Sequence, residues 1–140
     1  MNAQTNVEIG KILFDSIREG DLSSWEAALS DDFTFSYPGL RDGGDKQAAK
    51  AFNQIFVVAV PDLTFEVQRT LTDGDTIVYQ GVFGGTHTGP LALPTGTIPP
   101  TGRRGSVPGV LISVVRNGKI VREETYWNVL ELMEQLGAAP

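Results

Sequence analysis

The chain contains no cysteine, and this absence excludes several kinds of site. Without thiols there is no disulfide framework, no thiolate nucleophile and no zinc–thiolate centre. The sequence has a single histidine, His87, and no His-Glu-x-x-His pattern, which leaves only carboxylates to complete a transition-metal site. We therefore expect no bound metal.

An excess of positive charge is also missing. The chain has 11 Lys and Arg against 17 Asp and Glu, a formal net charge of −6, and no segment concentrates the basic residues. This argues against binding to nucleic acid or to an anionic lipid surface. No apolar run approaches the roughly 20 residues that span a bilayer, and Met1 to Gln4 lack the features of a secretory signal. We expect a soluble, cytoplasmic protein with neither nucleic acid nor membrane as a partner.

Two common families of catalytic motif are absent. The glycines form neither a Walker loop nor a dinucleotide fingerprint, so no nucleotide cofactor is expected. The segment from Gly105 to Gly109 does not match the Gly-x-Ser-x-Gly elbow of serine hydrolases, so a hydrolase triad lacks its usual nucleophile. The sequence thus implies no cofactor.

What is present suits one compact domain over residues 1–140, because 41% of the residues are apolar and the length is typical of a single domain. Ile9, Leu13 and Ile17 recur at helical spacing before Gly20 and predict a helix over about residues 4–19. Ser23 and Glu26 have the spacing of a capping box and predict a second, short helix that Asp31-Asp32 interrupts.

A third helix has the clearest periodicity and ends before Pro61. Its apolar positions are Ala48, Phe52, Ile55, Phe56 and Ala59.

The rest of the chain predicts a sheet. Phe33, Phe35 and Tyr37 alternate like a strand, and so do residues 63–71, which a turn at 73–75 joins to a returning strand at 77–83. Two further strands, about residues 106–116 and 119–127, flank Asn117-Gly118, which suits a two-residue type I′ turn. A short helix that ends at Glu134-Gln135-Leu136-Gly137 closes the predicted order.

This order predicts an α+β domain in which helices pack on one face of an antiparallel sheet. A strongly curved sheet of this kind leaves a pocket beneath the helices. Residues 88–105 contain four prolines and four glycines, and we expect them to form an ordered lid over the mouth of the pocket.

Several short motifs, in their order and spacing, resemble the SnoaL-like polyketide cyclase family over nearly the whole chain. They are Gly85-Thr86-His87-Thr88-Gly89, Pro99-Pro100-Thr101-Gly102-Arg103, Val107-Pro108-Gly109, Asn117-Gly118-Lys119-Ile120-Val121 and Gln135-Leu136-Gly137. The resemblance implies the cone-shaped α+β fold of the nuclear-transport-factor-2-like superfamily, with three N-terminal helices, a curved sheet around a pocket and a short C-terminal helix. That superfamily contains cyclases, isomerases, hydroxylase-like proteins and non-catalytic binders.

The resemblance also implies two functional positions. In cyclases of this family a carboxylic acid at the end of the last strand acts as general acid–base for an aldol ring closure, and a histidine helps to bind or polarise the substrate. The histidine matches His87, whereas the acid falls at position 128, which is Asn128 in this chain. An amide cannot shuttle a proton at neutral pH, so the family mechanism cannot be transferred unchanged.

Glu124 is the leading replacement for the missing acid. Strand alternation places Arg122, Glu124 and Tyr126 on the same face as Asn128 if no bulge intervenes. A glutamate in an aromatic cavity would have a raised pKa, as proton transfer near neutral pH requires. The alternative is that Glu124 pairs with Arg122 or Arg116 at a solvated rim.

Aromatic residues supply candidate substrate contacts. Tyr37 and Tyr126 could donate phenolic hydrogen bonds to a carbonyl, although a strand tyrosine often packs in a core instead. The helical faces carry further aromatic residues, which either form the pocket wall or fill the core: Phe14, Trp25, Phe52 and Phe56. His87 could likewise be a turn residue bonded to loop backbone rather than a pocket residue.

These observations predict a cofactor-independent acid–base enzyme of secondary metabolism that closes a ring on a largely apolar, polyketide-like substrate. In this hypothesis His87 and Tyr126 orient the carbonyl, Asn128 hydrogen-bonds the enolate and Glu124 moves the proton. The alternatives are a hydroxylase-like or isomerase relative, and a non-catalytic small-molecule-binding accessory protein. A homodimer through the outer sheet face, where Gln80 could lie, is also expected.

Overall fold

The computed structural model describes residues 3–38, 40–93 and 96–137. Helices and strands follow in the order α1 (Ala3–Gly10), α2 (Ile12–Glu19), α3 (Ser23–Ala27), β1 (Leu29–Tyr37), β2 (Leu40–Gly44), α4 (Lys46–Ala59), β3 (Thr64–Asp73), β4 (Thr76–Thr86), β5 (Leu91–Leu93), β6 (Gly96–Ile98), β7 (Arg104–Arg116), β8 (Lys119–Trp127) and α5 (Val129–Leu136).

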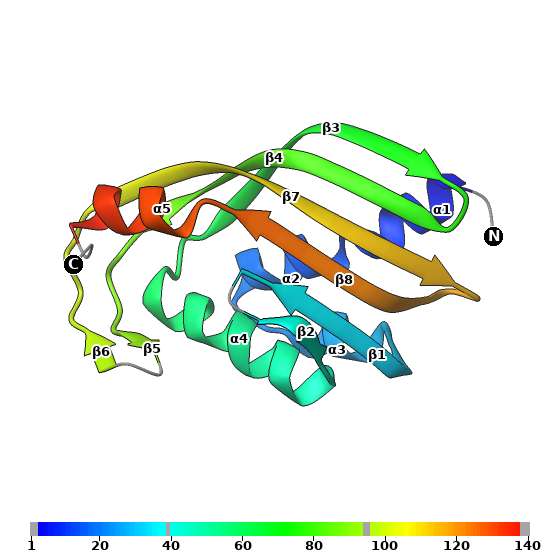
Figure 1. The fold of residues 1–140 in the computed structure, drawn as a ribbon, viewed down its shortest axis with the longest axis horizontal. Helices are drawn as coiled ribbons and strands as arrows, with labels where there is room; N and C mark the ends of the chain where they lie inside the picture. Colours follow the sequence, from blue (N-terminus) through cyan, green and yellow to red (C-terminus); the bar gives the residue numbers. More distant parts are fainter. Residues whose placement is uncertain (1–2, 39, 94–95, 138–140) are drawn as a thin grey trace.

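The main sheet has the strand order β2-β1-β8-β7-β4-β3. Neighbouring strands are antiparallel except β1 and β8, which run parallel. Figure 1 shows the long strands β3, β4 and β7 arching over α2 and α4, so that the helices cover the concave face of the sheet. This curved, mostly antiparallel α+β arrangement confirms the predicted fold class.

The core lies between the concave face and the helices. Its fully buried side chains include Trp25, Phe33, Phe35, Ile77 and Tyr79. A second, smaller cluster around Ala59, Val60 and Leu91 holds the β5–β6 hairpin against the end of α4.

The first predicted helix is divided at Lys11 into α1 and α2. Tyr79 crosses the chain at this point, and its hydroxyl donates a hydrogen bond to the Val7 carbonyl, which also accepts from Lys11 N. Gly10 permits this approach, because a Cβ there would overlap the Tyr79 hydroxyl. The predicted glycine cap is confirmed, since Gly20 has φ of 74° and ends α2.

The predicted capping box at the second helix is wrong. Ser23 is the first residue of α3 and does not cap it. Instead the Asp21 carboxylate accepts hydrogen bonds from both the backbone N–H of Ser23 (2.9 Å) and its hydroxyl (2.6 Å). The helix is also shorter than expected, and Asp31-Asp32 lie within strand β1.

The predicted third helix and the sheet hairpins are confirmed. Asp45 caps α4 by accepting from Ala48 N at 3.0 Å. Asn117 and Gly118 have φ of 52° and 78°, the positive values that a type I′ turn requires. Three short strands were not predicted, β2, β5 and β6, because each has only three to five residues and little alternation.

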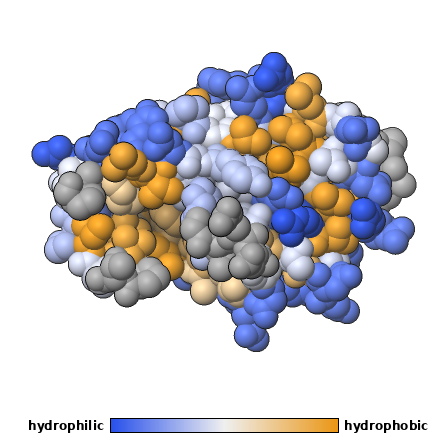
Figure 2. All heavy atoms as spheres, in the orientation of Figure 1, coloured by the Kyte–Doolittle hydropathy of each residue, from blue (hydrophilic) through white to orange (hydrophobic). Residues whose placement is uncertain are grey.

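The predicted lid segment contains the β5–β6 hairpin, except that residues 94–95 lie outside the described residues. Its apolar side chains Leu91, Leu93 and Ile98 pack with Phe56 of α4 and Met133 of α5. Figure 2 shows hydrophobic side chains gathered over α5 and this hairpin at one end of the molecule.

A bulge in β8 reverses the expected alternation of its side chains. Ile120 pairs with Val115 and Arg122 with Val114, so Val121 is an extra residue in the ladder. After the bulge Glu123, Thr125 and Trp127 face the concave side, and Arg122, Glu124 and Tyr126 face away from it. The prediction that Glu124 faces the cavity requires strict alternation along β8, and the bulge at Val121 makes it wrong.

Candidate functional site

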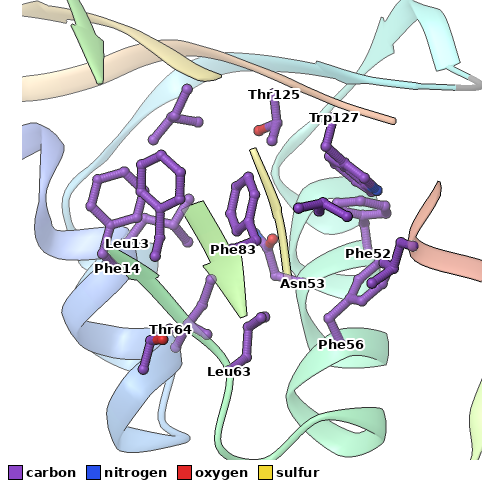
Figure 3. A pocket seen from close by; sticks show the side chains of 15 residues that line it. Leu13, Phe14, Phe52, Asn53, Phe56, Leu63, Thr64, Phe83, Thr125 and Trp127 are labelled. Carbon is purple, nitrogen blue, oxygen red and sulfur yellow. The ribbon is translucent and has the colours of Figure 1, made fainter. Parts of the chain in front are cut away.

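An aromatic cavity opens between the concave face of the sheet and helices α2 and α4 (Figure 3). Its volume is about 70 Å³. The side chains that line it are mostly apolar: Leu13, Phe14, Ile17, Phe52, Asn53, Phe56, Leu63, Thr64, Phe65, Phe83, Val107, Leu111, Thr125, Trp127 and Leu132.

Two groups of tilted and edge-on rings form the cavity walls. On one side Phe65 lies 4.7 Å from Phe14 and 4.3 Å from Phe83, measured between ring centroids. On the other side Trp127 packs against Phe52 at 5.8 Å and Phe56 at 5.9 Å. Such walls suit a flat, apolar molecule, because aromatic pairs favour offset and edge-to-face contacts.

The few polar groups of the cavity come from opposite walls. Asn53 is only 6% exposed on α4, and its Nδ2 has no hydrogen-bond partner. The Trp127 Nε1 is also buried without a partner. Figure 3 shows the Asn53 amide and the Thr125 hydroxyl directed into the interior from α4 and β8. Since a buried, unpaired N–H is costly, these donors favour a ligand that accepts hydrogen bonds.

No carboxylate or imidazole is among the described residues that line this cavity. The nearest acid along β8 is Glu123, two residues before Thr125 on the same face and fully buried. Trp25 Nε1 donates to its Oε1 at 2.8 Å, and its Oε2 has no partner. Burial raises the pKa of Glu123 to about 7, although the hydrogen bond from Trp25 acts in the opposite direction.

The structure places Glu124 on the face of β8 that points away from the cavity. Its carboxylate accepts from the Tyr126 hydroxyl at 2.7 Å and from Arg122 Nε at 2.8 Å. These contacts, the tyrosine first, lower the pKa of Glu124, so the expected raised pKa is wrong. The structure instead has the ion pair between Glu124 and Arg122 that was the alternative interpretation. Tyr126, like Glu124, lies outside the cavity.

Asn128 also lies outside the cavity. It is the N-cap of α5, and its side-chain oxygen accepts from Glu131 N at 3.0 Å. The residue therefore has a helix-capping role in this structure, and an acid at this position would sit at the start of α5 rather than among the aromatic rings.

His87 follows the last residue of β4 and is completely buried, but it is not among the cavity-lining residues. Its Nδ1 lies 3.1 Å from the Thr101 hydroxyl. Its backbone N–H donates a hydrogen bond to the Arg103 carbonyl, and its carbonyl accepts one from Gly102 N, across the base of the β5–β6 segment. Its Nε2 has no partner. This geometry matches the turn interpretation of His87, in which the ring braces a loop.

The predicted substrate contacts are divided between the cavity and the core. Phe14, Phe52 and Phe56 line the cavity. Trp25 lies in the core beside Glu123, and Tyr37 stacks on Phe52 at 3.8 Å behind the wall. The structure thus brings three of the five predicted contacts together and leaves two behind the wall.

Asn53, Thr125 and Trp127 were missed by the sequence analysis. Asn53 follows Ala49 by four residues and so lies on the apolar face of its helix, where a polar residue is informative. Thr125 and Trp127 alternate with Glu123 along β8, but the bulge at Val121 hides which face they share. The helical periodicity was therefore enough to identify Asn53, whereas the alternation in β8 was not enough to identify Thr125 and Trp127.

Among the described residues, no group of three or more acidic or histidine side chains is arranged to hold a metal ion. Within the same part of the chain, none of the helices has the length and apolarity to cross a membrane.

The model of the SnoaL-like polyketide cyclase family matches residues 10–136 of the chain. No curated protein shows a significant sequence match. Among solved structures, a protein assigned as a SnoaL-like polyketide cyclase from Jannaschia sp. CCS1 is 23% identical, with a TM-score of 0.82 over 98% of this chain and 94% of its own.

Two Streptomyces proteins are similarly close in fold. IdmH, assigned as a polyketide cyclase, from Streptomyces antibioticus is 25% identical, with a TM-score of 0.79 over 94% of this chain and 98% of its own. AclR, assigned as a hydroxylase, from Streptomyces galilaeus is 21% identical, with a TM-score of 0.83 over 99% of this chain and 89% of its own. These likenesses support the fold, and they span neighbours with different assigned activities.

Proposed function

Because the chain belongs to the SnoaL-like polyketide cyclase family, we propose that it is an enzyme of small-molecule metabolism that closes a ring on an apolar, polyketide-like substrate. The observation that carries this proposal is the aromatic cavity with a buried, unpaired amide donor, Asn53 Nδ2, in its wall. A carbonyl oxygen is the ligand group that such a donor complements, and ring closure by aldol addition takes place at a carbonyl.

In the proposed reaction a carbon atom that lies between two carbonyls of the substrate loses a proton. The resulting enolate carbon attacks the carbon of a further carbonyl in the same chain. A carbon–carbon bond forms, and the attacked oxygen becomes an alkoxide that takes up a proton. Asn53 donates to this oxygen, where negative charge develops, and the aromatic walls hold the chain folded for attack.

The proton released from carbon is returned to oxygen, so the closure needs no net proton. Thr125 is the buried hydroxyl of the cavity wall, and it can relay the proton in one concerted step, in which its oxygen accepts the proton from the substrate carbon while its own proton passes to the substrate oxygen, so that no charged hydroxyl forms. We assign it the transfer. His87, Glu124, Tyr126 and Asn128 take no part in this version of the mechanism, because none of them lines the cavity.

The test is incubation of the purified protein with an open-chain polyketide ester whose closure forms its only ring, with chromatography and mass spectrometry of the products. A product that differs from the substrate by ring closure, with or without loss of water, supports the proposal. Thr125→Val removes the hydroxyl at nearly constant shape and should lower the rate by about 10²-fold or more. Retention of the full rate by Thr125→Val would remove Thr125 from the mechanism.

A non-catalytic binding protein is the second candidate function, and one observation favours it. The described lining residues include no carboxylate or imidazole, the groups that most often catalyse proton transfer. In this case the open-chain ester binds but is recovered unchanged. A product that has gained an oxygen atom would instead favour the hydroxylase-like alternative, and a rearranged open chain would favour an isomerase.

We further propose a homodimer through the convex face of the sheet. The residues that face away from the helices include Val78, Val110 and Ile112, all half-buried and paired across β4 and β7. Gln80 and Tyr126 lie on the same side and line a shallow groove with Val110. An apolar sheet face of this kind suits a second copy of the same surface.

A further inference from the structure

The cavity is small for a polycyclic substrate. Its volume is about 70 Å³, whereas pockets that hold drug-sized ligands have about 300–1,000 Å³. Benzene binds in an engineered apolar cavity of about 150 Å³. A single ring can therefore enter if one lining side chain shifts, but a fused polycycle would require displacement of a whole ring from the wall.

The chemistry of the wall restricts the charge of the ligand. None of the described lining residues is charged, and an ion in an apolar cavity without a partner would be strongly destabilised. The unpaired Asn53 Nδ2 donates, so the ligand has to accept. These features select an uncharged ring that carries a carbonyl oxygen.

One part of the wall separates the cavity from further space. A second hollow of about 190 Å³ lies between α2 and β3, and its lining includes Lys11, Arg18 and Val67. Phe14 and Phe65 line both hollows. Their ring centroids are 4.7 Å apart and their planes are inclined at 42°. We call this pair of rings the Phe14–Phe65 partition, because it separates the two hollows. Figure 3 shows Phe14 extending from α2 on the side of the cavity opposite Trp127.

We propose that the site takes an uncharged one-ring carbonyl compound, and that the Phe14–Phe65 partition sets this size limit. The inference rests on the proposed function and deepens it by naming the substrate class. Asn53 fixes the carbonyl, the ring lies against the aromatic walls of the cavity, and the partition keeps larger ligands from extending into the α2–β3 hollow.

Calorimetric titration of the intact chain with a graded set of probes tests the inference. Acetophenone, 2-acetonaphthone and 2-acetylanthracene vary the number of rings, ethylbenzene removes the carbonyl, and benzoate adds a charge. Phe14→Ala removes the partition and should join the two hollows. Phe56→Ala is the matched control, because it deletes the same side chain from a wall that does not border the second hollow.

The wild-type chain should bind acetophenone, with ethylbenzene about tenfold weaker for lack of the hydrogen bond. Benzoate, 2-acetonaphthone and 2-acetylanthracene should not bind, because the first is charged and the other two exceed one ring. Phe14→Ala should gain binding of 2-acetylanthracene and Phe56→Ala should not. If Phe14→Ala does not fold, Phe14→Val removes most of the ring and takes its place.

Tight binding of 2-acetylanthracene by the wild-type chain would overturn the size limit, and an equal gain in both variants would overturn the role of the partition. Either result leaves the proposed function standing. Failure of every ketone to bind any of these proteins would overturn the proposed function as well.

Discussion

At the cavity wall, Asn53 places a polar side chain where an apolar one would make a more stable protein. Its Nδ2 is buried without a partner, and a group of this kind destabilises a fold by about 1–3 kcal/mol. Asn53→Leu keeps the branched shape of the side chain, although leucine is larger, and removes the unpaired donor. We expect this variant to unfold at a higher urea concentration than the wild type, by about 1 kcal/mol. A loss of stability would show that the amide has a partner in the folded protein.

Glu123 should make the stability of the protein depend on pH. Burial raises its pKa from 4.5 to about 7, so between these values the folded chain keeps a proton that the unfolded chain has released. The free energy of unfolding should therefore fall by about 3 kcal/mol in total as the pH rises from 4.5 to 7. Above pH 7 it should level off.

Glu123→Gln should abolish this dependence and be more stable than the wild type at pH 8, because an amide can still accept from Trp25 and needs no proton. Urea denaturation at pH 4.5, 6 and 8 measures the effect. Glu124→Gln is the matched control, because contacts with Tyr126 and Arg122 lower the pKa of Glu124. Its substitution should therefore remove stability at neutral pH, the opposite of the effect expected for Glu123→Gln. A wild-type stability that rises between pH 5 and 7 would contradict the account.

Residue-level prediction from the sequence succeeded on helices and failed on β8. The apolar spacing in the first and third predicted helices identified Phe14, Phe52 and Phe56, and all three line the cavity. The face of Glu124 was wrong because a single extra residue, Val121, reverses the alternation. Alternation is a local rule, whereas the bulge is visible only in the pairing of β8 with β7.

Among the elements, α5 begins at a cap that the sequence analysis interpreted as part of the active site. Asn128→Ala should destabilise the protein by about 1 kcal/mol, because Glu131 N loses its acceptor. Asn128→Asp should preserve the cap and the helix, since aspartate is an equally good N-cap and its charge suits the helix start.

Neither substitution should change turnover of the open-chain ester, because residue 128 does not line the cavity. Urea denaturation and product formation, measured on both variants, separate a capping role from a catalytic one. A gain of cyclised product in Asn128→Asp alone would show that this position reaches the substrate.

The elements that were predicted have strong local signals. Helix α4 has a full apolar face, and the β7–β8 hairpin has an Asn-Gly turn. The missed strands β2, β5 and β6 have weak local signals, because each has only three to five residues. The missed break between α1 and α2 instead depends on a residue distant in sequence, Tyr79 of β4.

For the whole molecule, the convex face determines the oligomeric state that we propose. Ile112→Glu places a charge at the centre of this face and should convert a dimer to a monomer, measured by size-exclusion chromatography with light scattering. Leu130→Glu is the matched control, because Leu130 is 58% exposed and belongs to α5, not to the strands that form this face. A monomeric wild type at micromolar concentration would contradict the proposal.

We propose that chemistry takes place in the aromatic cavity around Asn53 and not on the outer face around Glu124. Measurement of kcat/KM for ring closure of the open-chain ester by the wild type, Asn53→Leu and Glu124→Gln distinguishes the two places. We expect a loss of about 10²–10³-fold in Asn53→Leu, as for removal of a donor to a developing oxyanion, and little change in Glu124→Gln. Full activity in Asn53→Leu together with loss of turnover in Glu124→Gln would contradict this proposal and place the site on the outer face of β8.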